Sequence, residues 1–250
     1  MGNMSIKNIL DELVERYETA DFIKDDPIQF PHRYSKKEDV EIAAFLASLL
    51  AYGKRELFIK KLDFIFSFMD KGPYDFVLNF EAKENCLDNF VYRFVKDSDL
   101  KCLFRSLNKL YSEGSSLEHL FAGGTQKAAD YFYDNADCSA GFGFYHLIPN
   151  PKKGGALKRF NMFLRWMARK GPVDLGIWTS LPPSELFIPL DVHVGNISRS
   201  LGLLKRSAND FKSVSELTEK LREFDAGDPI KYDFALFGAG IDKIALGRDR

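Results

Sequence analysis

The stretch SKKEDVEIAAFLASLLAYG, residues 35–53, decides the fold class of this chain. Ser35 followed by Glu38 has the spacing of a capping box, which predicts a helix with Ser35 as its N-cap. After Glu41 the segment is apolar on nearly all sides, as in a central, buried helix. Gly53 stands where helices commonly end. A buried helix needs other elements packed around it, and the neighbouring sequence predicts that these are helices too.

Helical periodicity continues in both directions from this segment. Further helices are expected at 6–17, 58–69, about 84–95, about 98–112, about 125–135, about 155–170 and 191–201. A second capping box at Ser213–Glu216 predicts another helix, and Asp228-Pro229 predicts the start of a last one that runs through Phe237. No segment has a convincing strand pattern. The predicted fold class is therefore all-α, with many short helices.

Composition is that of an ordinary globular protein. The 250 residues are 45% apolar and 28% charged, which is enough apolar surface to bury a core and argues against disorder. This length predicts a single unit of two interlocked lobes, roughly residues 35–145 and residues 1–34 with 146–250.

Several kinds of site and segment are not expected. Three scattered cysteines without a CxxC pair exclude a cysteine-ligated zinc or iron–sulfur centre and favour a reducing, cytoplasmic setting. The four histidines lack paired-ligand spacing, so no metal and no other cofactor is expected. The N-terminus has no signal-peptide core, and no run of about 18 apolar residues predicts a membrane span.

Charge is segregated along the chain, although the net charge is only -1. The window from Cys138 to Val173 contains no Asp or Glu, and Gly154 and Gly155 form a glycine turn that leads into a helix. Such a turn presents backbone N–H groups to phosphate. The window thus favours a phosphate-binding face, and the alternative is a basic helix whose acidic partners lie elsewhere in the fold. Its basic residues are Lys152, Lys153, Lys158, Arg159, Arg165, Arg169 and Lys170.

Asp191 lies between apolar residues immediately before a predicted helix, in the segment IPLDVHVGNISRSLGL, residues 188–203. An isolated aspartate at such a place is most simply an N-cap. His193 is most simply a partly buried, hydrogen-bonded histidine. The alternative is that this segment belongs to a catalytic site.

The same segment resembles the catalytic segment of helix-hairpin-helix DNA glycosylases, in which a glycine hairpin grips DNA phosphate. Lys158 matches the nucleophile of the lysine-bearing members, and its separation of 33 residues from Asp191 is similar to that in the archaeal 8-oxoguanine glycosylase branch. The usual Leu-Pro-Gly-Val-Gly hairpin is replaced by Pro-Lys-Lys-Gly-Gly at 151–155, and the iron–sulfur cysteines of some members are absent.

Three further motifs resemble those of a bacterial family of unassigned function. They are KRFNMFLRWM at 158–167, LAYG at 50–53 and IPLDVHV at 188–194. This second resemblance extends over nearly the whole chain.

The glycosylase resemblance implies a two-lobed helical fold and a DNA-repair glycosylase/lyase with DNA as its partner. Lys158 would attack C1′ of a flipped nucleotide, with Arg159 and a half-buried setting favouring the free amine. Asp191 would accept the amine proton or stabilise the charged sugar. Phosphate contacts are expected from Lys152, Lys153, Gly154, Gly155, Arg159 and Arg199.

The base pocket is expected to involve Tyr52, Phe163, Trp166, Trp178 and His193. Aromatic residues at helical spacing also fit a core, and Tyr52 is the best candidate because it lies at a helix end beside Gly53-Lys54-Arg55. Two alternatives remain open: a non-catalytic nucleic-acid-binding protein of the same fold, and an enzyme with diverged activity on another substrate.

Overall fold

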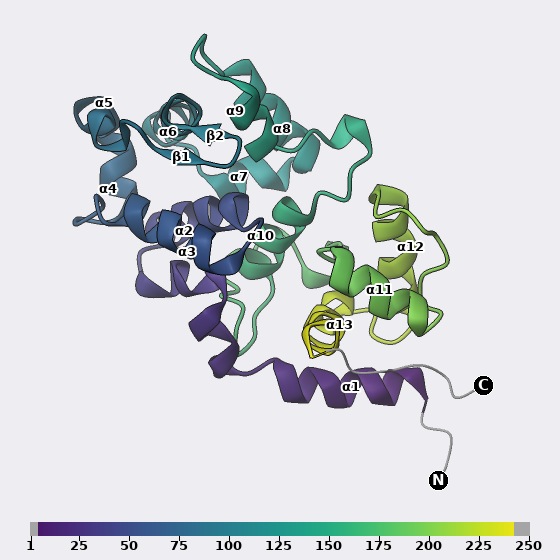
Figure 1. Ribbon diagram of the computed structural model, residues 1–250. Coiled ribbons are helices and arrows are strands. Elements are labelled where there is room, and N and C mark those ends of the chain that lie inside the picture. The colour runs from purple at the N-terminus through teal and green to yellow at the C-terminus, as the bar shows by residue number, and fades with distance from the viewer. Residues whose placement is uncertain (1–4, 243–250) are drawn as a thin grey trace. The chain divides into compact units, whose positions relative to one another are not determined.

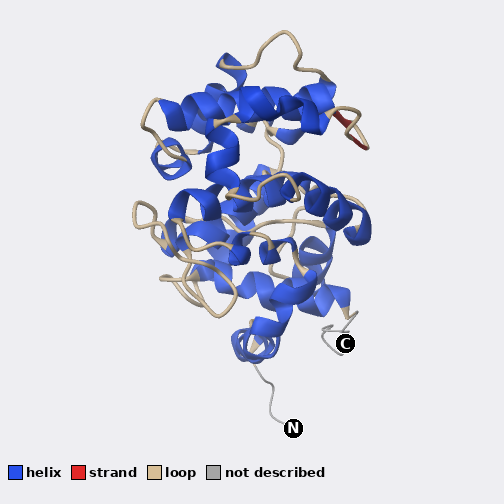
Figure 2. Cartoon of the chain, turned by 90° about the vertical axis from the view of Figure 1, so that its left-hand side faces the viewer, coloured by secondary structure: helices blue, strands red, loops and turns tan. Residues whose placement is uncertain are grey.

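The computed structural model describes residues 5–242, which divide into two compact, mainly helical units (Figures 1 and 2). One unit comprises residues 27–153, and the other joins residues 5–26 to 154–242. The predicted all-α class is confirmed in its coarse form, because helices dominate both units. The boundaries fall after residues 26 and 153, whereas the sequence suggested breaks after 34 and 145.

The unit of residues 27–153 is built around the helix that the opening segment predicts. Helix α2 (Lys37–Leu50) is buried without interruption from Asp39 to Leu50, and it contacts α3, α4 and α7. The helices of this unit are α2, α3 (Arg55–Phe66), α4 (Pro73–Leu78), α5 (Phe80–Lys83), α6 (Asp97–Ser112), α7 (Leu117–Ala122), α8 (Thr125–Asp134) and α9 (Phe142–Leu147). The 3-10 turns are η2 (Pro27–Gln29), η3 (Pro31–Arg33), η4 (Glu84–Leu87) and η5 (Pro151–Lys153).

The other unit brings the N-terminal helix against the C-terminal one. Helix α13 (Tyr232–Ile241) packs against both α1 (Ile6–Tyr17) and α11 (Val192–Ser200), as Figure 1 shows. Glycines permit this approach, since a Cβ atom on Gly240 would lie 2.8 Å from the His193 Cβ. The remaining elements are η1 (Ala20–Asp25), α10 (Lys158–Ala168), η6 (Pro183–Glu185), α12 (Phe211–Arg222) and η7 (Pro229–Lys231).

One short hairpin is the only sheet among the described residues, and it corrects the helix expected at 84–95. Strands β1 (Val91–Tyr92) and β2 (Val95–Lys96) pair antiparallel, with Val91 opposite Lys96 (red in Figure 2). Asn89 and Arg93 adopt positive φ, which a continuous helix cannot accommodate. The apolar residues of this segment have mixed spacing, so the sequence pattern did not indicate the turn.

Both predicted capping boxes are wrong. Lys36, not Ser35, is the N-cap of α2, and its side chain forms no capping hydrogen bond. Ser213 lies inside the first turn of α12, because Asp210 accepts the Ser213 N–H at 2.9 Å and so caps the helix three residues earlier. The Asp228-Pro229 pair opens the turn η7 rather than α13, and the Asp228 side chain forms no capping hydrogen bond.

No helix among residues 5–242 combines the length and the hydropathy that a membrane span requires.

The two capping sites give a matched test of the fold. We expect Asp210→Ala to lower the free energy of unfolding, because the α12 cap and the ion pair with Arg206 are both lost. Ser35→Ala should change it by less than about 0.5 kcal/mol, because no cap is removed. Urea denaturation followed by circular dichroism measures both. Equal losses in the two variants would contradict the observed helix starts.

Candidate active site

Lys158 and Asp191 lie together at the starts of two helices. Lys158 is the first residue of α10, and Asp191 is the N-cap of α11. The Asp191 Oδ1 atom accepts the Val194 N–H at 2.9 Å, and its Oδ2 atom accepts a hydrogen bond from Lys158 Nζ at 3.0 Å. Asp191 is thus both the N-cap that its position suggests and the partner of the lysine that the resemblance singles out.

The pair is shielded unequally from solvent. The Lys158 side chain is 33% exposed and the Asp191 side chain 15% exposed. Leu157, which precedes the lysine, is buried and has a φ of 51°, so the chain turns sharply before α10 begins. This turn shortens the helix expected at 155–170 to Lys158–Ala168.

A buried ion pair lies two helical turns beyond Lys158 on α10. Arg165 donates from Nη1 to Asp233 on α13 and from Nε to Asp174 at 3.2 Å. Arg165, Asp174 and Asp233 are all buried. The Asp233 Oδ1 atom is also buried and has no hydrogen-bond partner.

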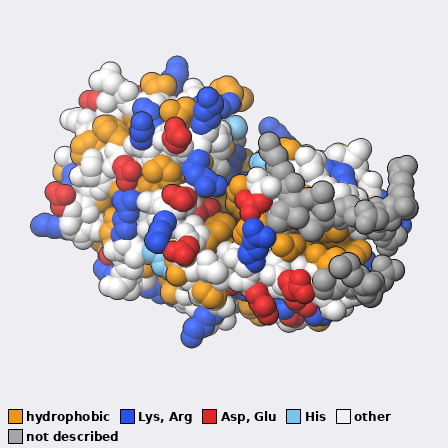
Figure 3. All heavy atoms as spheres, turned by 60° about the horizontal axis from the view of Figure 1, so that its bottom comes forward, with side chains coloured by type: hydrophobic (Ala, Val, Ile, Leu, Met, Phe, Trp, Pro, Cys, Tyr) orange, Lys and Arg blue, Asp and Glu red, His pale blue; other side chains and the backbone are white. Residues whose placement is uncertain are grey.

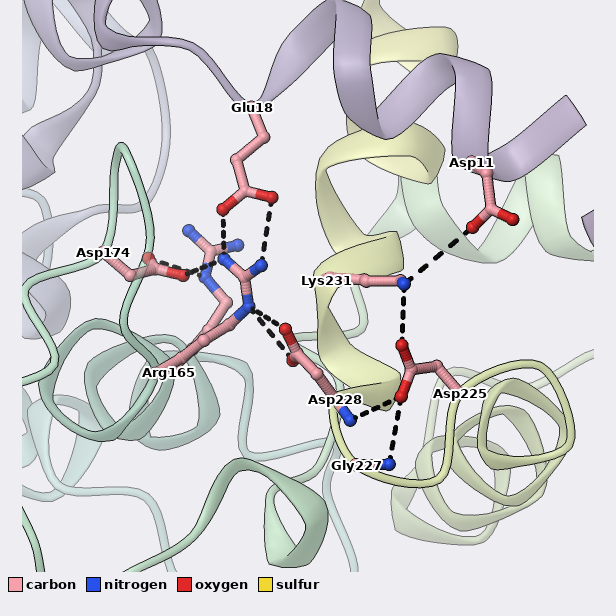
Figure 4. Close-up of polar contacts among 9 residues, drawn as sticks. Asp11, Glu18, Arg165, Asp174, Asp225, Gly227, Asp228 and Lys231 are labelled. Atoms are coloured by element: carbon pink, nitrogen blue, oxygen red, sulfur yellow. Dashed lines mark hydrogen bonds and ion pairs between the residues drawn. The ribbon is translucent and has the colours of Figure 1, made fainter. Parts of the chain in front are cut away.

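Arg169, at the end of α10, forms a second buried centre with carboxylates from three separate segments. It donates to both oxygens of Glu18, to Asp174 at 3.0 Å and to Asp228 at 2.8 Å. Figure 4 labels these three carboxylates and the neighbouring Arg165. Burial disfavours its charge, but the hydrogen bond to Glu18 and the neighbouring aspartates outweigh this and raise the pKa of Arg169.

The two centres together contain more carboxylates than cations. Arg165 and Arg169 face Glu18, Asp174, Asp228 and Asp233. Burial raises the pKa of Asp174 and of Asp228, although the guanidinium groups oppose it. Two guanidinium groups face four carboxylates, of which Asp228 is 28% exposed and the other three are buried, so the network carries surplus negative charge.

Asp233 is the group in this network whose titration reaches neutral pH. Burial raises its pKa to about 7, Arg165 opposes the increase, and the nearby Asp191 carboxylate adds to it. Lys158 also acts on Asp233 through its charge. The ionic network and the Lys158–Asp191 pair are therefore electrostatically coupled.

The seven basic residues do not form one phosphate-binding face. Arg165 and Arg169 are buried on acidic partners, Lys158 pairs with Asp191, and Lys152 lies 3.3 Å from Asp130. For these four residues the alternative interpretation, acidic partners elsewhere in the fold, is correct. On the one face that Figure 3 draws, Lys and Arg side chains are interspersed with Asp and Glu.

The remaining predicted phosphate contacts have mixed positions. Lys153 is exposed and Arg159 half-buried. The glycine turn is tied to α12, because the Gly154 carbonyl accepts the Phe211 N–H at 2.9 Å and Gly155 forms an isolated bridge with Asp210. Arg199 binds the carbonyls of Arg206 and Ala208 and the side chain of Asn209, so it holds its own loop rather than a free anion site.

The residues expected in the base pocket have unlike surroundings. Phe163, Trp166 and Trp178 are buried at 0–3% exposure, and Phe163 packs edge-on against Trp178, so they are core residues. His193 is exposed, which corrects its interpretation as partly buried, and its ring lies 6.2 Å from that of Phe237. Tyr52 belongs to the other unit, where it contacts Tyr92 and His146.

Sequence reasoning missed the acidic half of the network. Glu18, Asp174 and the neighbouring pair Asp228 and Asp233 come from three segments far apart along the chain. Asp233 is the only charged residue of α13, but it lies in the first turn, where acidic residues are common, so its position did not indicate the buried partner Arg165.

A family model described as "Protein of unknown function (DUF2400)" matches residues 26–242. The chain belongs to this family. The DUF2400 match includes Lys158, Asp191 and the whole ionic network apart from Glu18. No curated protein and no solved structure matches the chain.

The protonation of Asp233 predicts how stability depends on pH. Its pKa is raised from 3.8 to about 7, so the folded protein retains a proton that the unfolded chain loses. The stability from this group is fully present below about pH 3.8 and is lost as pH rises towards about 7. Asp233→Asn stays neutral over this range, so its free energy of unfolding should fall less between about pH 5 and about pH 8.

Urea denaturation of both proteins at the two pH values measures this difference. Glu223→Gln, which neutralises an exposed carboxylate of an exposed ion pair, is the control and should keep the wild-type dependence. The same fall in all three proteins would contradict the assignment of the proton to Asp233.

Proposed function

We propose that this chain is a DNA glycosylase with lyase activity, in which Lys158 is the nucleophile and Asp191 the base. One observation carries the proposal: Lys158 Nζ lies 3.0 Å from Asp191 Oδ2, with both residues at helix starts. The resemblance of segments 151–158 and 188–203 to lysine-bearing glycosylases supports the same roles for these two residues.

The geometry suits proton transfer. A separation of 3.0 Å lies within the hydrogen-bonding range that a general base needs. The cap to Val194 fixes Oδ1, so Oδ2 remains for the lysine. The lysine is partly exposed, so its amine is accessible, whereas the carboxylate is largely shielded from water. Reduced contact with water strengthens the interaction between the two groups.

The chemistry follows from these two groups. The lone pair of the Lys158 amine forms a bond to C1′ of a flipped nucleotide while the C1′–N bond breaks, and the base leaves with the bonding electrons and takes up a proton. Asp191 accepts the proton that the attacking amine loses. The C1′–O4′ bond then opens, O4′ takes up a proton, and a protonated imine joins Lys158 to C1′. Loss of a C2′ proton breaks the C3′–O bond and cleaves the strand.

The ionic network supports this proposal by holding α10 in place. Arg165 links the helix that begins with Lys158 to α13, which packs on α11, the helix that Asp191 caps. A lysine and an aspartate on separate helices stay within reach of each other only when both helix starts are fixed.

The imine intermediate gives a direct test. We expect the protein, mixed with DNA that contains an abasic site or 8-oxoguanine and treated with borohydride, to form a covalent adduct that migrates as a shifted band on a denaturing gel. Lys158→Ala should abolish the band, because borohydride traps an imine and this variant lacks the amine that forms it. Lys153→Ala, which removes an exposed lysine of the same window, should retain it.

An adduct that persists in Lys158→Ala would contradict the proposal, as would the absence of an adduct with either DNA. DNA binding without any adduct would instead favour the non-catalytic nucleic-acid-binding alternative.

The two roles of Asp191 can be separated by substitution. Asn is as good an N-cap as Asp, so Asp191→Asn should keep the α11 start but lower single-turnover excision by about 100-fold or more, because the base is lost. Asp191→Ala should lower excision similarly and also destabilise the protein by about 1 kcal/mol. Full activity in Asp191→Asn would show that Asp191 serves only as the N-cap of α11.

A further inference from the structure

The unit of residues 27–153 exposes an unusual group of aromatic side chains. Phe142 is 72% exposed, Tyr145 52% and Phe94 50%. Phenylalanine is among the residue types most often fully buried, so adjacent exposed rings call for an explanation. Together with Arg93 and His146, these side chains are called the stacking face below.

Three rings of the stacking face, those of Phe94, Phe142 and His146, lie against one another, whereas Tyr145 packs on Tyr133. The Phe94 ring lies 5.6 Å from that of Phe142 and 5.3 Å from the imidazole of His146. His146 also lies 4.9 Å from the Tyr52 ring, so the exposed rings continue into a partly buried aromatic base. Three segments far apart in sequence, the α2–α3 connection, the β hairpin and α9, meet at this group.

The exposed rings are held in place by buried contacts. The buried Asp99 carboxylate accepts the N–H groups of Gly141 at 2.8 Å and Lys96 at 2.9 Å, which ties the start of α9 to the hairpin. Gly143 has no room for a side chain, because a Cβ atom there would lie 2.7 Å from the Val95 Cα. The rings therefore project from a fixed base, which lowers the entropy cost of ordering them around a ligand.

Positive charge accompanies the rings. The Arg93 guanidinium lies 5.8 Å from the centre of the Phe94 ring and 5.9 Å from that of Tyr52. Arg93 also lies against Gly53, which is followed by the exposed cations Lys54 and Arg55. The tip of the hairpin presents its guanidinium through a backbone with a φ of 55°, a conformation uncommon for arginine.

We propose that the stacking face binds single-stranded nucleic acid, with unpaired bases stacked on Phe94 and Phe142 and phosphates bound by Arg93, Lys54 and Arg55. Flat rings beside cations match the two parts of a nucleotide, whose base has a π-face and whose backbone is anionic. A purely apolar protein segment would leave the cations without partners. A duplex would offer phosphates, but its bases are already stacked on each other.

This proposal is independent of the Lys158–Asp191 pair. The stacking face lies entirely within residues 27–153, and both catalytic candidates lie in the other unit. Either proposal can therefore be disproved without affecting the other.

Fluorescence anisotropy of the full chain with labelled oligothymidylate and oligouridylate tests the proposal and compares DNA with RNA. Phe94→Leu and Phe142→Leu keep an apolar side chain but lose the π-face, and each should weaken binding at least about fivefold. Phe142→Trp should retain binding. Phe64→Leu makes the same change at an exposed phenylalanine of α3 outside the stacking face, and should have no effect.

Charge supplies a second readout. Arg93→Gln should lower the slope of log Kd against log salt by about 0.7, the value expected for one lost phosphate contact to a single strand. Lys220→Gln removes an exposed cation of the other unit and should leave oligonucleotide affinity unchanged, which shows that the losses belong to the stacking face.

Three results would overturn the proposal: no binding of either oligonucleotide at low salt, unchanged affinity in both Leu variants, or equal losses in Phe64→Leu. Binding of an acidic peptide in place of either oligonucleotide would assign the surface to a protein partner.

Discussion

The buried guanidinium groups of Arg165 and Arg169 are the constraint on which the unit of residues 5–26 and 154–242 depends. Taking each cation out of water costs several kcal/mol unless carboxylates compensate it. The compensation comes from the end of α1, from the segment after α10, from η7 and from α13. These ion pairs therefore hold α10 in a defined position against four segments, which hydrophobic contact alone, being non-directional, would not do. Removal of one partner would leave a buried charge uncompensated, so the network holds its members in one arrangement.

The same network shapes the candidate active site. Lys158 opens the helix whose later turns carry both arginines, and Asp233 responds to the charges of Lys158 and Asp191. Four carboxylates around two guanidinium groups carry surplus negative charge, which a proton on Asp233 relieves near neutral pH. The lysine–aspartate pair therefore lies beside a buried group that changes its charge in the physiological range. The titration of Asp233 would therefore contribute to the pH dependence of the proposed excision reaction, in addition to any effect on the reacting pair.

The interpretation of charge shows where one-dimensional reasoning fails. The acid-free window with its seven basic residues resembled a phosphate-binding face, yet Arg165 and Arg169 are buried, because α10 is buried on all sides from Phe160 onward. Their acidic partners lie up to 151 residues away along the chain, and no local pattern indicates such a pairing. Among the aromatic residues, by contrast, some that could be expected in the core lie on the surface. Trp166 and Phe163 enter the core, as helical spacing of aromatics often implies, whereas Phe94 and Phe142 remain on the surface because a hairpin and a short helix present them there.

Local sequence patterns suffice to predict the helical class, the central position of α2 and the helix start at Asp191, because each depends on periodicity or on a residue and its immediate neighbours. The pairing of Lys158 with Asp191 was expected from the resemblance to glycosylases. Capping boxes failed at Ser35 and Ser213, since a competing backbone start or an earlier cap at Asp210 decides which residue begins the helix. Three contacts follow only from the three-dimensional structure. They are the hydrogen bond of Lys158 to Asp191, the buried ion pair of Arg165 with Asp233, and the packing of Phe94 against Phe142 on the surface. Those contacts join segments remote in sequence, and their free energies depend on distance and burial in three dimensions rather than on order along the chain.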